Sequence, residues 1–326
     1  IRGISCMVAA MFLISIQEAF AKYLGQSLPV AQVVWARYLG HLLLMILLLW
    51  PKNGASLLKA NRLSMQIIRS LILLIDTALF FVGLTMIGLA EATAIFFTVP
   101  LLVLLLSVPL LGERVSAKSI VAIAIGFIGT LVIVRPGFDS QGSAELAAAV
   151  AEISSQEIGA LCIFGAACCT AIYNVITRKL SNTDPMPVTL FYTAMVGALV
   201  SSLFVPFVWQ TPSSYTVWAA LISIGLFGGM AHSLIIIAHK YTAATTVAPF
   251  MYSQIFWALG FGWLIFGDLP DLYAYLGGAV VIGSGLYLFK QSREQRIEVD
   301  KSVDPDSPSD KRSAGAIIQP PETYQP

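Results

Sequence analysis

Apolar stretches of about twenty residues recur along almost the whole chain, and this recurrence constrains the fold more than any other feature. A helix needs about 20 mostly apolar residues to cross the roughly 30 Å of bilayer hydrocarbon. Ten segments meet that length: 4–23, 30–50, 66–88, 91–111, 117–135, 157–177, 187–209, 215–237, 245–266 and 272–290. Charged residues make up 11% of the chain, well below the roughly 25% of soluble domains. We therefore expect an all-α integral membrane protein with ten transmembrane helices.

The links between these segments are mostly short and carry Gly or Pro, so neighbouring helices should be antiparallel. The longest link, 138–156, is acidic, and we expect a surface loop there with a short amphipathic helix. After Lys290 the sequence becomes polar and contains proline. Such a segment cannot bury apolar surface, so 291–326 should be disordered. No stretch is suited to a soluble catalytic domain.

Basic residues are distributed unevenly between alternate links. With the N-terminus placed inside, the inner links and the tail hold most of them, including Lys52 and Arg69, whereas the outer side keeps only Lys22 and Arg135. Cytoplasmic loops of membrane proteins are enriched in Lys and Arg. We therefore expect both termini to be cytoplasmic, in a multi-pass protein of a bacterial inner membrane.

The two halves of the chain resemble each other at a spacing of 156 residues, in which Pro29 corresponds to Pro185. The proposed repeats are 1–137 and 157–290, each with five helices. Because five is odd, the second repeat must be inverted relative to the first. Inverted repeats are a common construction of secondary transporters, with the substrate site near the midplane between them. Chance similarity between apolar sequences is the alternative.

Short motifs follow one another in a fixed order over residues 1–290. They are WARY at 35–38, AEATA at 90–94 with Pro100, LGER at 111–114, APFMY at 248–252 and FGDLP at 266–270. In these motifs the chain resembles the drug/metabolite transporter superfamily, specifically its ten-helix EamA-like branch. The resemblance implies alternating-access transport of a small molecule. The second half departs from the family pattern, with Phe256 in register with Pro100 and Asp268 where glutamate is common.

Four charged residues are expected near the outer ends of their helices. Glu18 and Lys22 are four apart and share a helix face, Arg37 enters from the same side, and Glu91 starts the fourth helix there. Charges in hydrocarbon are costly unless they are paired or face a wet cavity. Our hypothesis is an ion-pair network that closes the outer side of the cavity. A static pairing that only lets these charges tolerate the membrane is the alternative.

Asp76 lies in the middle of the third segment, with no charged neighbour in sequence. An ionisable residue at that depth is a functional candidate by default. It could bind a proton for coupling, or a cationic group of the substrate. The structural alternative is a protonated carboxyl group that forms a hydrogen bond with a neighbouring helix.

Polar and aromatic residues in the middle of other segments are candidates for the same site. They could form a pocket for an amphipathic metabolite, since aromatic side chains supply apolar area with a polar group attached; each alone could equally be packing. The set is Gln17, Tyr173, Asn174, His232, Tyr252, Gln254 and Trp257. His232 could also carry a proton.

Small residues recur at a spacing of four in two segments, at Ala122 and Gly126 and at Ala279 and Gly283. Such patterns allow close helix approach, either within one chain or in a homodimer. The four cysteines lie in apolar runs without metal-ligand spacing to the histidines. We expect no metal site and no cofactor.

These observations favour a secondary transporter over other classes. The net charge of +1 does not suit a nucleic-acid binder, and no Walker loop for ATP is present. We expect the partners to be the lipid bilayer and a small metabolite, amino-acid-like or S-adenosylmethionine-like, moved by proton coupling or exchange. The alternative is an integral-membrane enzyme that modifies lipid. The sequence leaves the substrate and the direction of transport open.

Overall fold

The computed structural model describes residues 2–111, 117–134, 155–180, 183–241 and 248–302, and within these ranges the secondary structure is helical, without strands. Eight helical segments are long and apolar enough to cross a membrane. Two shorter apolar helical segments, Ile120–Ile133 and Phe250–Phe266, occupy the places of the fifth and ninth expected spans. The chain is therefore a multi-pass membrane protein. Most of the loop 138–156 and the motif around Glu113 lie outside the described residues.

The long helices agree with the expected spans to within a few residues at most ends. In the first half they are α1 (Arg2–Gly25), α2 (Val30–Asn53), α3 (Leu63–Leu84) and α6 (Ala117–Val134), with the short helix η1 (Gly54–Leu58) after α2. In the second half they are α7 (Ser155–Leu180), α8 (Met186–Val208), α9 (Tyr215–Tyr241) and α12 (Leu272–Ser302). Apolar runs of this length form helices in lipid because a helix satisfies its own backbone hydrogen bonds.

Two expected spans are broken rather than continuous. The segment 91–111 divides into α4 (Leu89–Phe96) and α5 (Val99–Leu111), and the segment 245–266 contains η2 (Ala248–Ser253), α11 (Gln254–Phe261) and η3 (Gly262–Phe266). Pro100 explains the first break, because proline has no N–H to donate to the carbonyl oxygen of Phe96 four residues earlier. The second break has no proline in register with Pro100. Pro249 lies within η2, directly before α11, but we did not expect a break there.

The last helix extends beyond the expected boundary of the tail. α12 continues past Lys290 to Ser302, so the first part of the segment 291–326 is helical rather than disordered. Lys290 Nζ lies 3.9 Å from Glu294 Oε1, one turn along the helix. Such pairs stabilise exposed helices by a few tenths of a kcal/mol each. Residues 303–326 lie outside the described residues.

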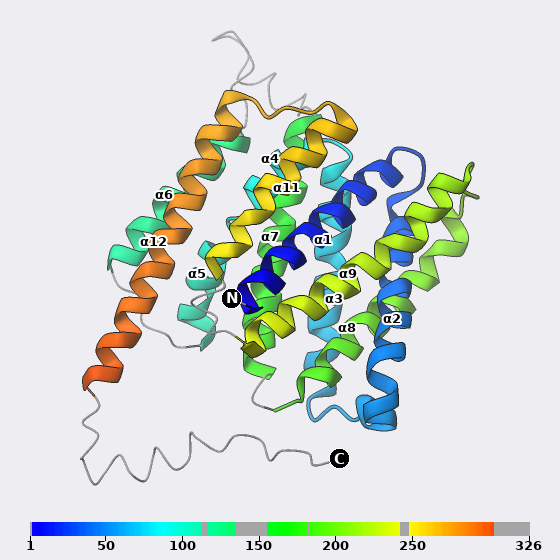
Figure 1. Cartoon of the computed structure of the whole chain (residues 1–326), viewed down its shortest axis with the longest axis horizontal. Helices are drawn as coiled ribbons and strands as arrows, with labels where there is room; N and C mark the ends of the chain where they lie inside the picture. The colour runs from blue at the N-terminus through cyan, green and yellow to red at the C-terminus, as the bar shows by residue number, and fades with distance from the viewer. Residues whose placement is uncertain (1, 112–116, 135–154, 181–182, 242–247, 303–326) are drawn as a thin grey trace.

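The helices pair between the two halves of the chain. α1 packs mainly on α9, α3 on α7, α2 on α8, and α6 on α12. The α6–α12 pair lies at one edge of the bundle, in contact with α4 and α5 (Figure 1). The α2–α9 contact requires glycine, since a Cβ atom on Gly40 would lie 2.8 Å from the Cα atom of Gly225.

Of the two small-residue patterns, the first is used within the chain. A Cβ atom on Gly126 in α6 would lie 2.6 Å from the Ser284 hydroxyl oxygen in α12. By contrast, a Cβ atom on Gly283 would have no neighbour within 4 Å. The first pattern thus serves intramolecular packing, whereas Gly283 borders open space.

The turns α1–α2 and α7–α8 have the same backbone hydrogen bonds. The N–H groups of Ser27 and Leu28 donate to Leu24 O, and those of Gln32 and Val33 to Pro29 O. Each of these bonds recurs 156 residues later, on the N–H groups of Thr183, Asp184, Val188 and Thr189. Both following helices begin directly after a proline, Pro29 or Pro185, where the fixed φ of proline suits a helix start.

Candidate substrate and coupling site

Arg37 occupies the middle of a group of polar side chains from several helices. It lies in α2 and is buried, with 8% of its surface exposed. Its Nη1 atom donates to Thr77 Oγ1 at 3.1 Å, and its guanidinium carbon lies 4.9 Å from the ring centroid of Tyr38. Its Nε atom is buried and has no hydrogen-bond partner in the described part of the chain. This cation therefore has unused capacity to donate a hydrogen bond.

Two buried carboxylates share the charge of Arg37. Glu18 Oε1 in α1 accepts a hydrogen bond of 2.8 Å from Gln254 Nε2, and Asp76 Oδ1 in α3 accepts one of 2.7 Å from Thr170 Oγ1. Both carboxylates interact electrostatically with Arg37, although neither forms a salt bridge with it among the described side chains. Glu18 Oε2 is buried without a partner in the same part of the structure. The positive charge of Arg37 is thus shared electrostatically between Glu18 and Asp76.

Two histidines complete this group. The rings of His41 in α2 and His232 in α9 are stacked, with centroids 5.6 Å apart and an angle of 8° between their planes. The Nε2 atom of His41 is buried and lacks a partner among the described residues. We call Glu18, Arg37, His41, Asp76 and His232 the Arg37 cluster. No three His, Cys, Asp or Glu side chains in the described ranges are arranged to hold a metal ion.

Three more of the predicted residues lie on the helices around this cluster. Gln17 lies against α9, where a Cβ atom on Gly228 would overlap its side chain. Gln254, at the start of α11, joins the cluster through Glu18. Trp257, also in α11, packs edge-on against Phe12 of α1 with ring centroids 4.9 Å apart.

The remaining predicted residues lie elsewhere. Tyr252 packs edge-on against Phe97 at 4.9 Å between centroids, and its buried hydroxyl has no partner among the described residues. Tyr173 and Asn174 follow each other in α7, and the ring of Tyr173 lies under Arg69. Tyr173 is therefore part of a different group of side chains.

The ion pair of Lys22 differs from the one expected among the outer charges. Its ammonium group forms a salt bridge with Asp268, not with Glu18, and donates to Ile87 O at 2.9 Å. Glu91 lies in the first turn of α4, and both its Cβ atom and that of Asp268 are 4.0 Å from the position of a Cβ atom on Gly88. Asp268 and Glu91 thus lie on either side of Gly88, at the start of α4. We call the Lys22–Asp268 pair and its bond to Ile87 the Lys22 link.

Arg69 is a second buried arginine, in α3. We expected it in an inner link, but it is fully buried, because α7 and α8 pack on α3 at this level. Its Nη2 atom donates to Thr189 O at 2.6 Å and to the Thr193 hydroxyl. Its Nη1 atom donates to Thr177 Oγ1 at 3.3 Å, and its guanidinium carbon lies 4.8 Å from the ring centroid of Tyr173.

The start of α3 is tied to the α7–α8 turn by Asp184. Its Oδ1 atom accepts from the backbone N–H of Asn61 at 2.6 Å, and its Oδ2 atom accepts from Gln66 Nε2 at 3.1 Å. Asn61 Nδ2 also donates to Thr183 O at 2.5 Å. We call this group, together with Arg69 and its partners, the Arg69 network.

Sequence reasoning missed His41 and Arg69 as members of these groups and gave Asp268 no partner. His41 is a single polar residue in an apolar run, and nothing in the sequence links it to His232. The position of Asp268 in the FGDLP motif was a signal, but its partner is 246 residues away.

Curated proteins similar to this chain are transporters by name. An S-adenosylmethionine uptake transporter of Rickettsia prowazekii is 27% identical over 297 residues, 90% of this chain and 94% of that protein. The pseudopaline exporter CntI of Pseudomonas aeruginosa is 27% identical over 86% of this chain and 93% of its own length. A riboflavin transporter of Vibrio cholerae is 29% identical over 63% of this chain and 65% of its own length.

A solved crystal structure has the same fold, with a TM-score of 0.60 and 17% sequence identity over 89% of this chain and 98% of that one. The model of the EamA-like transporter family matches residues 1–135 and 157–289. These relatives point to a transporter rather than an enzyme. The chain belongs to the EamA-like transporter family, within the drug/metabolite transporter superfamily.

Proposed function

We propose that this protein is a secondary active transporter that moves a small metabolite by alternating access between two inverted repeats of five helices. The helix pairings support this proposal. In the register of 156 residues, α1 corresponds to α7 and α3 to α9, so the pair α1–α9 becomes the pair α7–α3, and both pairs are observed. The recurring hydrogen bonds of the α1–α2 and α7–α8 turns support the same register.

The two broken spans support a site between the repeats. In the register of 156, Thr98, in the break between α4 and α5, corresponds to Gln254, the first residue of α11. Discontinuous helices in corresponding positions of two repeats are characteristic of transporters with a central site. Gln254 donates to Glu18 of the Arg37 cluster. The second break therefore adjoins the candidate site.

The charges of the Arg37 cluster carry the functional proposal. With both carboxylates ionised and both histidines neutral, Glu18, Asp76 and Arg37 together have a net charge of −1. Such a site favours one added positive charge, because an uncompensated charge in the membrane interior is costly. That charge is supplied either by a proton or by a cationic group of the substrate. Binding of one then competes with the other, which couples transport to protons or to exchange.

A substrate with an amino or sulfonium group suits this site. The unpartnered Nε atom of Arg37 offers a place for an anionic or carbonyl oxygen of the same molecule, so we propose an amino-acid-like or S-adenosylmethionine-like substrate. The name of one relative, the S-adenosylmethionine uptake transporter, supports this substrate class. Asp76 and Glu18 would receive the cationic group.

We place the protein in a bacterial inner membrane with ten spans and both termini in the cytoplasm. The Lys22 link then lies at the outer end of the bundle and the Arg69 network at the inner end. In this arrangement Lys22, with Asp268 as its partner, is the gate at the outer side, and Glu91 lies beside it. Arg37 and Glu18 belong to the binding and coupling site instead.

Counterflow in proteoliposomes tests the proposal. Vesicles loaded with unlabelled S-adenosylmethionine, or with a methionine analogue, should accumulate the labelled compound faster than empty vesicles, and external acidification should change the rate. Only a carrier that alternates between the two sides produces this acceleration. Equal uptake by loaded and empty vesicles for a broad panel of amino compounds would reject the proposed substrate class. Chemical conversion of reconstituted lipid would favour the lipid-modifying enzyme.

A further inference from the structure

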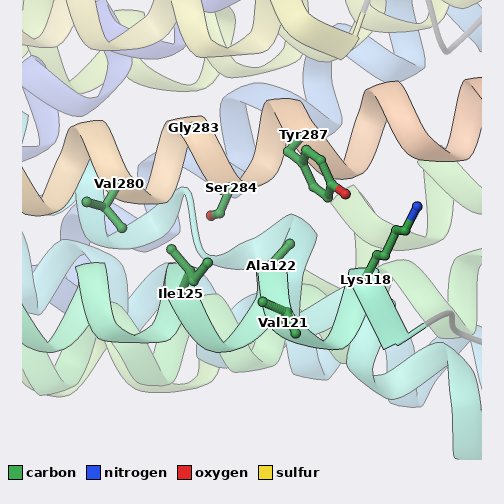
Figure 2. Close-up of a pocket in the computed structure, with 8 residues that line it drawn as sticks. All are labelled: Lys118, Val121, Ala122, Ile125, Val280, Gly283, Ser284 and Tyr287. Carbon is green, nitrogen blue, oxygen red and sulfur yellow. The ribbon is translucent and has the colours of Figure 1, made fainter.

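A groove between α6 and α12 lies apart from the Arg37 cluster, at the edge of the bundle. It has a volume of about 600 Å³, and its walls are formed by apolar side chains of both helices, including Val121, Ile125 and Val280. Figure 2 shows Ile125 and Val280 facing one another across the groove. Val121 and Ile125 are 59% and 47% exposed. An apolar groove at this position opens toward the hydrocarbon of the membrane.

One end of the groove is polar and positively charged. The ammonium group of Lys118 and the hydroxyl group of Tyr287 both project toward this end (Figure 2). Ser284 adds a hydroxyl group further in. Lys118 is the second residue of α6, so in the proposed orientation it lies at the inner surface of the membrane. Lys290, three residues after Tyr287, is exposed at the same level of α12.

We propose that the groove binds an anionic phospholipid of the inner leaflet, with an acyl chain between α6 and α12 and the phosphate group at Lys118. Charge complementarity selects this occupant, because the apolar walls suit an acyl chain and the cation at the membrane surface suits a phosphate. Basic pockets between transmembrane helices on the cytoplasmic side are known to bind anionic head groups. Tyrosine is likewise favoured at the membrane–water interface. Neither the substrate nor the Arg37 cluster takes part.

Gly283 allows the groove to be filled without disturbing the fold. A side chain at this position would meet nothing within 4 Å, and replacing glycine within a helix does not oppose its conformation. Gly260 in α11 is a matched control, since a Cβ atom there also has no neighbour within 4 Å. Lys59, an exposed lysine of the α2–α3 link, is the matched control for Lys118.

The experiment measures lipid retained by the purified full chain in native mass spectrometry. Equal amounts of phosphatidylglycerol and phosphatidylcholine with the same acyl chains are offered in mild detergent. The wild-type protein should retain phosphatidylglycerol about fivefold more than phosphatidylcholine, the preference expected for one lysine near the surface. Lys118→Gln should bring the two lipids to parity, whereas Lys59→Gln should keep the preference.

Gly283→Leu should lower the retention of both lipids several-fold, and Gly260→Leu should not. Unchanged retention of phosphatidylglycerol in both Lys118→Gln and Gly283→Leu would overturn the proposal. A dimeric mass of the wild-type protein that disappears in Gly283→Leu would also overturn it, because the groove would then hold a second copy of the chain. Thermal unfolding midpoints confirm that the variants are folded, and Lys118→Gln, on an exposed side chain, tests the proposal independently of Gly283.

Discussion

Two buried arginines are placed similarly against aromatic rings but have different surroundings. Arg37 lies 4.9 Å from the ring of Tyr38 and Arg69 lies 4.8 Å from the ring of Tyr173. Around Arg37 are two carboxylates and two histidines, all able to change charge. The hydrogen-bond acceptors of Arg69 are two threonine hydroxyls and a backbone carbonyl, which stay neutral.

This difference separates a site that can change its state from one that cannot. Protonation or ligand binding alters the electrostatic balance around Arg37, whereas the described hydrogen-bond acceptors of Arg69 carry no charge that could change. We infer that the Arg37 cluster serves transport and that the Arg69 network holds α3 on α7 and α8. The same substitution at the two arginines should therefore affect different quantities.

Arg37→Gln should have the largest effect, on transport. Removing a buried cation leaves Glu18 and Asp76 without compensation, and losses of this kind reduce binding on the order of 100-fold. The initial rate of labelled substrate counterflow in proteoliposomes measures it. The unfolding midpoint should fall less than in Arg69→Gln, since among the described residues Arg37 donates a single hydrogen bond, to Thr77. Wild-type counterflow in Arg37→Gln would remove Arg37 from the mechanism.

Arg69→Gln should act on stability instead. It removes charge-assisted hydrogen bonds to Thr189 and Thr193 from a fully buried position, which should lower the free energy of unfolding by roughly 2 kcal/mol. The thermal unfolding midpoint in detergent measures this change, with exposed Lys52→Gln as the control. Transport per folded molecule should remain close to wild type. A stable Arg69→Gln variant with impaired counterflow would contradict the assignment of Arg69 to the scaffold.

Asp76→Asn should reduce counterflow about tenfold, which corresponds to about 1.4 kcal/mol. The fold should tolerate it, because the amide oxygen can still accept the hydrogen bond from Thr170. Thr170→Val is the matched control, since it removes that hydrogen bond and keeps the carboxylate. The pH dependence of transport should weaken in Asp76→Asn and persist in Thr170→Val. An Asp76→Asn variant with an unchanged rate and pH profile would exclude Asp76 from coupling.

Breaking the Lys22 link by Lys22→Met should change the free energy of unfolding least among these variants. Asp268 has a side chain that is 38% exposed, and a partly solvated pair of this kind contributes less than about 1 kcal/mol. Breaking it by Lys22→Met should instead open the outer side. A cysteine in place of Ile87, in a background without the native cysteines, should then react several-fold faster with an impermeant maleimide.

The exchange variant Lys22→Asp with Asp268→Lys tests whether the pair itself closes the outer side. It should return the labelling rate toward that of the parent protein, because the attraction between the two positions is restored. Labelling that is the same in all three proteins would show that the Lys22 link is not a gate.

The helical membrane fold could be predicted from the sequence, because an apolar segment of twenty residues satisfies its backbone hydrogen bonds in lipid by forming a helix. The long-range partners could not be predicted from the sequence. The spacing of four residues along one helix suggested Glu18 as the partner of Lys22, whereas the observed partner is Asp268, far along the chain. Arg69 resembled a surface charge because its partners in α7 and α8 are more than 100 residues away.

The break before Gln254 was also missed, for a different reason. In the first half, Pro100 indicates the break between α4 and α5. In the second half, the residue 156 positions later is Phe256, which does not disfavour a helix. The local signal there is Pro249 in η2, and the segment also has long-range contacts, namely the bond of Gln254 to Glu18 and the contact of Tyr252 with Phe97. These contacts join residues far apart in the chain, so they leave no pattern in the local sequence.

The length of α12 has a mechanical consequence. Its 31 residues make a rod of about 46 Å at 1.5 Å per residue, whereas the hydrocarbon is about 30 Å thick. In the proposed orientation, the last turns of α12 project from the membrane into the cytoplasm as a continuous helix. A small tilt of α12 inside the membrane is thus carried to Ser302 as a larger displacement.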